Sequence, residues 1–270
     1  MKVSFKMGVA LALLLALVPA LVGAAPQAPK GKLVYEDDFS SGAKSKLEDN
    51  LTATDYQRGF HPPGVYHIKL SKNDQTEWSL FPSQSYAEFS VLLDMFDFSD
   101  DINAGTVAQG LVFRAQDDAH FYTVLLDPRS GKYAVRKLDG ANKWSDLIAF
   151  KASPLVKRQK DVNHLRVDGE GGAFTIYLND EQLDTFKDAS YAQGGIGFIV
   201  ANTDAKEPHM HFDNIKVYTT DAAKSGTGSA PSDLPKTGQG TTDATLMVLL
   251  GALLLLSMGV GLRSQSRTHE

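Results

Sequence analysis

Short runs of strand-forming residues, separated by glycine, proline, asparagine and aspartate, fill the centre of this chain and constrain its fold most. No stretch between residues 31 and 220 has a convincing helical period, and many runs alternate apolar and polar residues, as half-buried strands do. Connections such as Asp127-Pro128-Arg129-Ser130-Gly131 and Asn179-Asp180 have the composition of hairpin loops. The sequence therefore predicts an all-β fold, a two-sheet antiparallel β-sandwich or jelly roll over residues 31–220. The expected strands are Lys32–Asp38, Val65–Leu70, Glu77–Phe81, Ala87–Met95, Val107–Arg114, Phe121–Leu126, Lys132–Leu138, Leu147–Phe150, His164–Asp168, Ala173–Leu178, Glu181–Phe186, Gly194–Ala201 and His209–Tyr218.

The absence of cysteine and the acidic charge narrow the possible functions. Without cysteine the chain has no disulfide, no thiolate nucleophile and no cysteine-based zinc site. A domain of this length buries roughly 70% of its unfolded surface, so its core can hold it without disulfides. The formal net charge is −5, which argues against nucleic acid or an anionic membrane surface as partner.

The N-terminus has the three parts of an export signal. Lys2 and Lys6 precede an apolar run that continues to Val22, and the small residues Gly23-Ala24-Ala25 follow. This order predicts a signal peptide over residues 1–25, cut near Ala24 or Ala25, and therefore an exported protein. Pro26 disfavours a cut immediately before it, so the sequence leaves the exact bond open.

The C-terminus has an equally ordered arrangement. Asp221–Asp233 is rich in small residues and predicts a flexible linker, and a pentapeptide with a central Pro235 follows. The apolar run Ala244–Leu262 approaches the roughly 20 residues that a transmembrane helix needs. The tail of residues 263–270 carries two arginines, which favours a cytoplasmic location.

This arrangement resembles the LPXTG-type sorting signal of bacterial surface proteins that sortases attach to the cell wall. The motif residues are Leu234, Pro235, Lys236, Thr237 and Gly238. The resemblance implies that a sortase cuts between Thr237 and Gly238 and joins Thr237 to peptidoglycan. The protein is then held in the membrane by its C-terminal helix before sorting and is cell-wall anchored at the cell surface afterwards. A plain C-terminal membrane anchor is the alternative.

Several central segments follow one another in a recognisable order: Gly110–Tyr122, Leu125–Asp127, Asn163–Val167, Ala173–Asn179, Gly194–Phe198 and Phe212–Val217. Together they resemble the concanavalin A-like lectin/glucanase superfamily, especially its laminin-G-like and keto-disaccharide-hydrolase-like branches. The resemblance implies a two-sheet jelly roll, often with a concave sheet that faces sugar and sometimes with a calcium ion. Because such folds include lectins, hydrolases and adhesion modules, the resemblance alone does not decide activity.

We identify no catalytic residues in the sequence. Glucanases of this superfamily carry Glu-x-Asp-x-x-Glu on one strand, and Glu36-Asp37-Asp38 lacks the last glutamate. Asp94 and Asp97 would point to opposite faces of a regular strand. Asp117-Asp118 and Asp180-Glu181 have the character of turns, and a serine nucleophile elbow is also missing.

Residues of two regions are candidates for binding carbohydrate, because sugars need flat apolar rings beside hydrogen-bonding groups. The first group is Trp144, which follows a polar turn, with Arg114 and Tyr122. The second group is Arg58, His61 and Tyr66, around a Pro62-Pro63-Gly64 loop. The alternative for these rings is a place in the core, which we favour for Trp78, Tyr122 and Tyr177 because they lie within predicted strands.

Two metal sites are conceivable. On a strand, His209, His211 and Asp213 would share one face and could bind zinc, although a polar outer face over the apolar Met210 and Phe212 explains the same alternation. Asp213 with Glu36 or Asp37 could bind a structural Ca²⁺ if the first and last strands are neighbours. No cofactor is required by the sequence.

Taken together, these patterns predict an exported, cell-wall-anchored protein whose β-sandwich binds a glycan without catalysis. The first alternative is a glycoside hydrolase of the keto-disaccharide-hydrolase type. The second alternative is a protein-binding adhesin or spacer.

Overall fold

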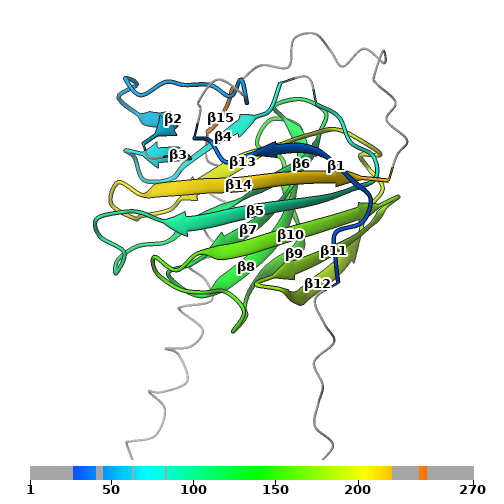
Figure 1. Ribbon diagram of the computed structural model, residues 1–270. Coiled ribbons are helices and arrows are strands. Elements are labelled where there is room, and N and C mark those ends of the chain that lie inside the picture. Colours follow the sequence, from blue (N-terminus) through cyan, green and yellow to red (C-terminus); the bar gives the residue numbers. More distant parts are fainter. Residues whose placement is uncertain (1–26, 41–44, 63, 83, 221–236, 242–270) are drawn as a thin grey trace, which may run out of the picture.

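A computed structural model describes residues 27–40, 45–62, 64–82, 84–220 and 237–241, which form strands and no helix (Figure 1). Among these residues no helix is long and apolar enough to cross a membrane. The predicted signal peptide, the linker, the apolar segment Ala244–Leu262 and the C-terminal tail lie outside the described residues, as do the first three residues of the sorting motif.

Two antiparallel sheets face each other, which confirms the predicted all-β sandwich (Figure 1). The first, with eight strands, has the order β12-β11-β10-β5-β14-β3-β2, and β1 pairs with β14 beyond this path. Its strands are β1 (Lys32–Asp37), β2 (Tyr56–His61), β3 (Val65–Leu70), β5 (Phe89–Asp97), β10 (Asn163–Glu170), β11 (Ala173–Leu178), β12 (Glu181–Lys187) and β14 (His209–Thr219).

The second sheet has seven strands in the order β15-β4-β13-β6-β7-β8-β9. Strands β6, β7, β8 and β9 follow one another in sequence and in space, so this half of the sheet is a meander. Its strands are β4 (Gln75–Leu80), β6 (Val107–Ala115), β7 (His120–Asp127), β8 (Lys132–Asp139), β9 (Trp144–Ala152), β13 (Gly195–Asn202) and β15 (Thr237–Thr241).

The core lies between the sheets and is rich in phenylalanine. Phe198 of β13 stacks on Phe212 of the opposite sheet with ring centroids 4.6 Å apart, and Phe113 of β6 packs against Phe174 of β11 at 5.4 Å. All four rings are buried. Each fully buried phenylalanine stabilises the fold by roughly 1.5–3 kcal/mol, so this aromatic layer fixes the two sheets face to face.

Charged groups are also buried where the sheets meet. Arg58 of β2, with no exposed surface, reaches Glu48 at 2.9 Å and Glu77 of β4 at 3.5 Å, and it donates to the Trp78 carbonyl at 2.7 Å. Arg129 forms a second buried pair with Asp97 at 2.9 Å. Arg58 therefore links an edge strand of one sheet to the other sheet.

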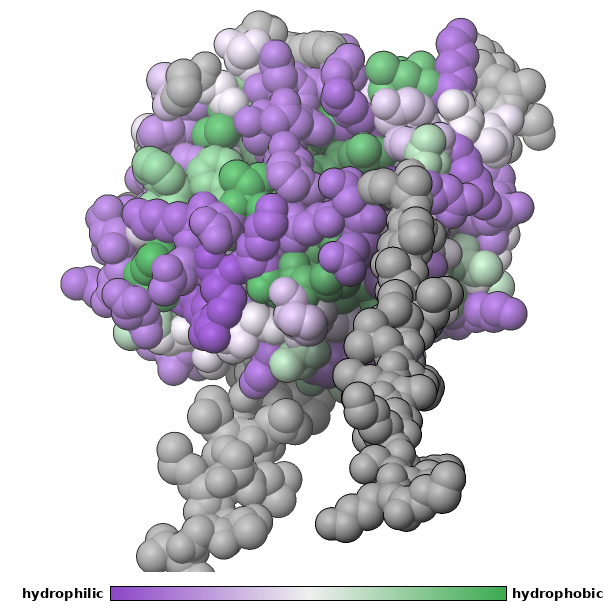
Figure 2. Space-filling model, turned by 60° about the horizontal axis from the view of Figure 1, so that its bottom comes forward, coloured by the Kyte–Doolittle hydropathy of each residue, from purple (hydrophilic) through white to green (hydrophobic). Residues whose placement is uncertain are grey.

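The two outer faces differ in character. Because Leu111 and Phe113 of β6 point into the core, Val112 lies on the outer face of the seven-stranded sheet, in a second apolar cluster with Trp78 and Phe121. The outer face of the eight-stranded sheet carries charged residues and histidines instead. Figure 2 shows a mainly hydrophilic surface on which apolar residues form small, separate areas.

The predicted strands correspond to observed ones, with shifts at their ends, but β2 and β15 were not predicted. Strand β2 was not predicted because it buries Arg58 and contains Gly59, so apolar and polar residues do not alternate along it. Strand β15 pairs with the edge of β4, Thr237 opposite Ser79 and Gly238 opposite Trp78. The bond that a sortase would cut therefore lies in an edge strand.

Candidate functional site

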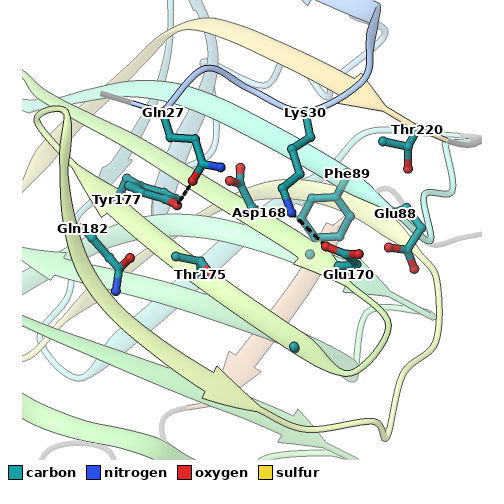
Figure 3. A pocket seen from close by; sticks show the side chains of 12 residues that line it. Gln27, Lys30, Glu88, Phe89, Asp168, Glu170, Thr175, Tyr177, Gln182 and Thr220 are labelled. Carbon is teal, nitrogen blue, oxygen red and sulfur yellow. Dashed lines mark hydrogen bonds and ion pairs between the residues drawn. The ribbon is translucent and has the colours of Figure 1, made fainter. Parts of the chain in front are cut away.

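A pocket of about 380 Å³ opens on the outer face of the eight-stranded sheet, over β10, β11 and β12 (Figure 3). The N-terminal residues Gln27 and Lys30 form one wall, and Thr220 beyond the end of β14 contributes to another. Most of the lining is polar, whereas the seven-stranded sheet has an apolar outer face. The lining residues are Gln27, Lys30, Glu88, Phe89, Asp168, Gly169, Glu170, Ala173, Thr175, Tyr177, Gln182 and Thr220.

Strand alternation places the floor of this pocket. Leu165 and Val167 of β10 belong to the core. Because side chains alternate along a strand, Arg166 and Asp168 point to the outer face. On β11 the register sets Tyr177 opposite Arg166 and Thr175 opposite Asp168. Two neighbouring strands thus present a guanidinium, a carboxylate, a hydroxyl and an aromatic ring on one face.

Tyr177 is the more exposed of the two aromatic residues that line the pocket, the other being the buried Phe89. The sequence favoured a core position for Tyr177. The guanidinium of Arg166 lies 3.7 Å from the centre of the tyrosine ring, a close cation–π contact. The tyrosine hydroxyl donates to the side-chain oxygen of Gln27 at 3.0 Å, and Arg166 donates to the Gln27 carbonyl. The N-terminal segment is therefore tied across the pocket at Gln27 (Figure 3).

The carboxylates of the pocket have different environments. Burial raises the pKa of Asp168, although a hydrogen bond from Ser90 and the charge of Arg166 act against this. The hydrogen bond and charge of Lys30, whose ammonium lies 2.9 Å from the Glu170 carboxylate, lower the pKa of Glu170. One acid is thus biased toward its neutral form and the other toward its charged form.

Four of the sequence candidates for sugar binding are buried and already hydrogen-bonded within the fold. Arg114 donates to the carbonyls of Tyr191 and Ala87 at 2.8 and 2.6 Å, and Tyr122 donates to Asp188 at 2.5 Å. Tyr66 contacts the Glu48 carbonyl at 2.9 Å and the Ser79 hydroxyl at 2.7 Å. Arg58 is held by Glu48 and Glu77. With almost no exposed surface, these four residues stabilise the sandwich, and we do not include them in the candidate pocket.

Trp144 and His61 remain accessible in part. Trp144 is the first residue of β9 and lies on the outer face of the seven-stranded sheet. Its ring meets the Phe121 ring edge-to-face, with centroids 5.7 Å apart, and the Arg136 guanidinium carbon lies 5.2 Å from its ring centre. His61 ends β2 on the outer face of the other sheet, among three further histidines. The sequence candidates therefore lie in separate places and do not form one site.

The histidine pattern of β14 has the predicted orientation, because Met210 and Phe212 are buried in the core and His211 lies on the opposite face. The structure adds His67, whose strand is adjacent, so that His67, His209 and His211 bring nitrogen atoms within 4.8 Å of one another. Burial lowers the pKa of His67 and His211 to about 3 and that of His209 to about 4. All three imidazoles are therefore neutral at pH 7.

The acids expected to bind calcium lie at the end of β1, where Glu36 and Asp37 are the last two residues, and in β14, which contains Asp213. The two strands pair, as predicted, with Asp37 opposite Ile215. Glu36 is engaged by Lys216 at 3.1 Å, and Asp37 accepts from Tyr35 at 3.0 Å and from the Phe39 amide at 2.9 Å. Burial, then nearby acids including Asp37, raise the pKa of Asp213. Calcium binding here stays a prediction.

The comparisons with known proteins report on the fold. No family model and no curated protein matches the chain. A Bacillus subtilis protein of unknown function with a galectin-like fold is 14% identical, with a TM-score of 0.50 over 71% of this chain and 98% of that one. This likeness supports a galectin-like sandwich and nothing finer, because the identity is low.

Two further structures are similar at TM-scores just below this value. The carbohydrate-binding module CBM66 from Bacillus subtilis is 20% identical with a TM-score of 0.49, covering 64% of this chain and 99% of that one. A Bacillus licheniformis β-glucanase is 10% identical with a TM-score of 0.48, covering 70% and 98%. Neither likeness concerns the residues of the candidate site.

No local pattern in the sequence indicates that the lining residues form one pocket. Its residues come from the N-terminal segment, from the start of β5, from β10, β11 and β12, and from just beyond β14, and the pairing of these strands brings them together. The outward alternation of His164, Arg166 and Asp168 is the one signal that sequence reasoning had available.

Proposed function

We propose that this chain is an exported, cell-wall-anchored surface protein that binds carbohydrate without catalysis in the pocket beneath Gln27 and Lys30. The observation that carries this proposal is the composition of the pocket, in which donors and acceptors surround the half-buried ring of Tyr177. Sugars present hydroxyl edges and apolar faces, so they match such a surface.

The size and charge of the pocket support a short glycan. Ligand pockets have volumes of roughly 300–1,000 Å³, and about 380 Å³ suits one or two sugar units. Lys30 pairs with Glu170 at 2.9 Å, and the lining also contains the carboxyl groups of Glu88 and Asp168, so the pocket favours a neutral polyol over an anionic ligand. Asp168 and Thr175 lie opposite each other on neighbouring strands and would hydrogen-bond adjacent hydroxyls.

Calorimetry with wall-derived oligosaccharides tests the location of the site. Tyr177→Ala is expected to weaken binding by about 1 kcal/mol or more, roughly fivefold, because the sugar loses its aromatic contact. Trp144→Ala is the matched control, since Trp144 is a partly exposed aromatic on the other sheet. Loss of affinity in Trp144→Ala with no change in Tyr177→Ala would move the site to the seven-stranded sheet.

A glycoside hydrolase is the second candidate, and one observation favours it. Asp168 and Glu170 lie two residues apart on β10, and their surroundings shift their pKa values in opposite directions. Two acids with pKa values pushed apart are a typical acid and base pair. The Cα atoms of residues at this spacing in a strand lie about 6.7 Å apart, and inverting enzymes hold their two carboxyl groups about 6.5–9.5 Å apart.

Asp168→Asn separates the two candidates. A hydrolase would lose turnover of an oligosaccharide while keeping its binding, because the amide cannot donate the proton. A binding module shows no reducing-end release in either form. If neither binding nor hydrolysis is found, a protein-binding adhesin or spacer becomes the better proposal.

Attachment to the cell wall is proposed from the sorting motif. Thr237 and Gly238 lie in β15, the edge strand of the seven-stranded sheet, which among the described residues pairs only with β4. A sortase needs an extended peptide in its cleft, so β15 has to leave β4 before Thr237 is cut. Thr237→Ala is expected to leave the protein extractable by detergent, and covalent retention in the wall would contradict the proposal.

A further inference from the structure

Four histidines gather on the outer face of the eight-stranded sheet, at the end away from the pocket. In the antiparallel register His211 of β14 lies opposite His67 of β3, and His209 is two residues along β14 on the same face. His61 of β2 lies opposite Val65, two residues from His67 along β3, and its ring centroid is 5.5–5.8 Å from those of the other three histidines. Three neighbouring strands thus direct imidazoles toward one point.

The ring nitrogens of three of these histidines are in direct contact. Nδ1 of His67 lies 2.5 Å from Nε2 of His209, and Nε2 of His211 lies 3.0 Å from the same nitrogen. In a neutral imidazole, Nε2 has either one proton to donate or one lone pair to accept with. Nε2 of His209 therefore cannot form a good hydrogen bond with both neighbouring rings at once. No carboxylate is recorded in a hydrogen bond to these three rings among the described residues, unlike His120 with Asp117 and His164 with Asp94.

His67 provides a second, independent sign that the cluster has a ligand. Its side chain is 4% exposed, and its Nε2 atom has no hydrogen-bond partner within the part of the chain that the structure describes. An unpaired buried polar atom costs about 1–3 kcal/mol. A fold keeps such a group most readily when something else engages the ring.

We propose that His67, His209 and His211 bind a divalent transition-metal ion, Zn²⁺ above all, and that His61 closes the fourth side of the site. Zn²⁺ binds imidazole nitrogen at about 2.0–2.1 Å and prefers four ligands in a tetrahedron, which sets its nitrogens about 3.3 Å apart. The observed contacts of 2.5 and 3.0 Å need only a small widening to reach this geometry.

The surroundings suit a buried imidazole site. Phe98 stacks on His211 with ring centroids 4.4 Å apart and an interplanar angle of 20°, and Phe96 meets the same ring edge-on at 5.0 Å. These rings shield the nitrogens from water and limit the movement of His211. Lys69, two residues from His67 on β3, directs its ammonium group toward Glu207 at 3.7 Å.

The proposed ion would join β2, β3 and β14, so its role is to hold the edge of the eight-stranded sheet. Strand β2 is at that edge, and it also carries Gly59, which faces His67 across the ladder without a side chain. The site differs from the zinc site expected from sequence, because His67 takes the place of Asp213.

Metal titration of the full chain, produced without a polyhistidine tag and stripped of metal, tests the proposal. We expect one Zn²⁺ per chain by calorimetry and a rise of about 5 °C or more in melting temperature. Co²⁺ should give the visible absorption of a tetrahedral nitrogen site. His209→Gln should weaken Zn²⁺ binding at least tenfold and abolish the Co²⁺ spectrum.

His164→Ala is the matched control, because His164 lies on the outer face of the same sheet but pairs with Asp94 at 2.6 Å. Its Zn²⁺ affinity should equal that of the unmodified chain. Circular dichroism establishes that each variant is folded. Absence of stoichiometric binding to the folded unmodified chain, or equal binding by His209→Gln, would overturn the proposal.

Discussion

Replacement of Arg58 by alanine tests whether this arginine stabilises the fold or contacts a ligand. Its guanidinium is fully buried and lies between Glu48 and Glu77, with a further hydrogen bond to the Trp78 carbonyl. Removing one partner from a buried ion pair costs about 3–5 kcal/mol, because the remaining charge stays unpaired. We therefore expect Arg58→Ala to lower the free energy of unfolding by that amount at neutral pH.

The cost should depend on pH in a defined direction. Burial raises the pKa of Glu77 to about 7 despite the opposing charge of Arg58, whereas in the unfolded chain it is near 4.5. The folded state then binds more protons, so this group's contribution to stability falls as pH rises from about 4.5 to 7. Without Arg58 the pKa rises further, and ionising Glu77 becomes more costly.

The difference can be estimated from one pKa unit, which is worth about 1.4 kcal/mol. At pH 8.5, about 1.5 units above the pKa of Glu77, Arg58→Ala should lose about 2 kcal/mol more than at pH 5.5. Urea unfolding followed by tryptophan fluorescence at both pH values measures this. The double variant Arg58→Met with Glu77→Gln should recover part of the loss. A loss below about 1 kcal/mol, or one equal at both pH values, would refute this reasoning.

Three further predictions concern pH, metal and folding. The pKa values of His67, His209 and His211 are lowered to about 3–4, so the unfolded chain binds protons at a higher pH than the folded chain does. The metal-free chain should therefore lose stability as pH falls below 6.5, by roughly 2 kcal/mol per imidazole between pH 7 and 5. A urea midpoint that is the same at pH 7 and pH 5 would contradict this prediction. If calcium binds near Asp37 and Asp213, Ca²⁺ added to the metal-free chain should raise its melting temperature, and no shift would remove that site. Asp97→Ala should cost about 3–5 kcal/mol in urea unfolding, because it leaves Arg129 buried without its carboxylate, and a loss near zero would show that the pair contributes little.

The fold was predictable wherever alternation matched burial. Residues such as Leu165 and Val167 in β10, or Met210 and Phe212 in β14, alternate with polar neighbours and enter the core as expected. The pattern failed in β2, where the side chain that enters the core is Arg58. The buried Arg58 is stabilised by Glu48, Glu77 and the Trp78 carbonyl, and such contacts between distant segments cannot be read from local sequence.

The candidate sites were less predictable, because strand register creates them. Alternation correctly placed His209 and His211 on one face, yet only the pairing of β14 with β3 adds His67. Tyr177 was assigned to the core because it lies in a strand, but its parity on β11 directs it outward beside Arg166. Arg114 and Tyr122 failed as surface candidates for the opposite reason, since their polar ends find partners inside the sandwich.

Binding of the purified protein to a glycan array tests the central claim most directly. The array should include wall polysaccharides and neutral oligosaccharides of one to three units, and Tyr177→Ala should be applied to the same slides. We predict specific binding to a small set of related neutral glycans, with signals that fall in Tyr177→Ala. A blank array from the folded protein, or signals that Tyr177→Ala leaves unchanged, would contradict carbohydrate binding in this pocket.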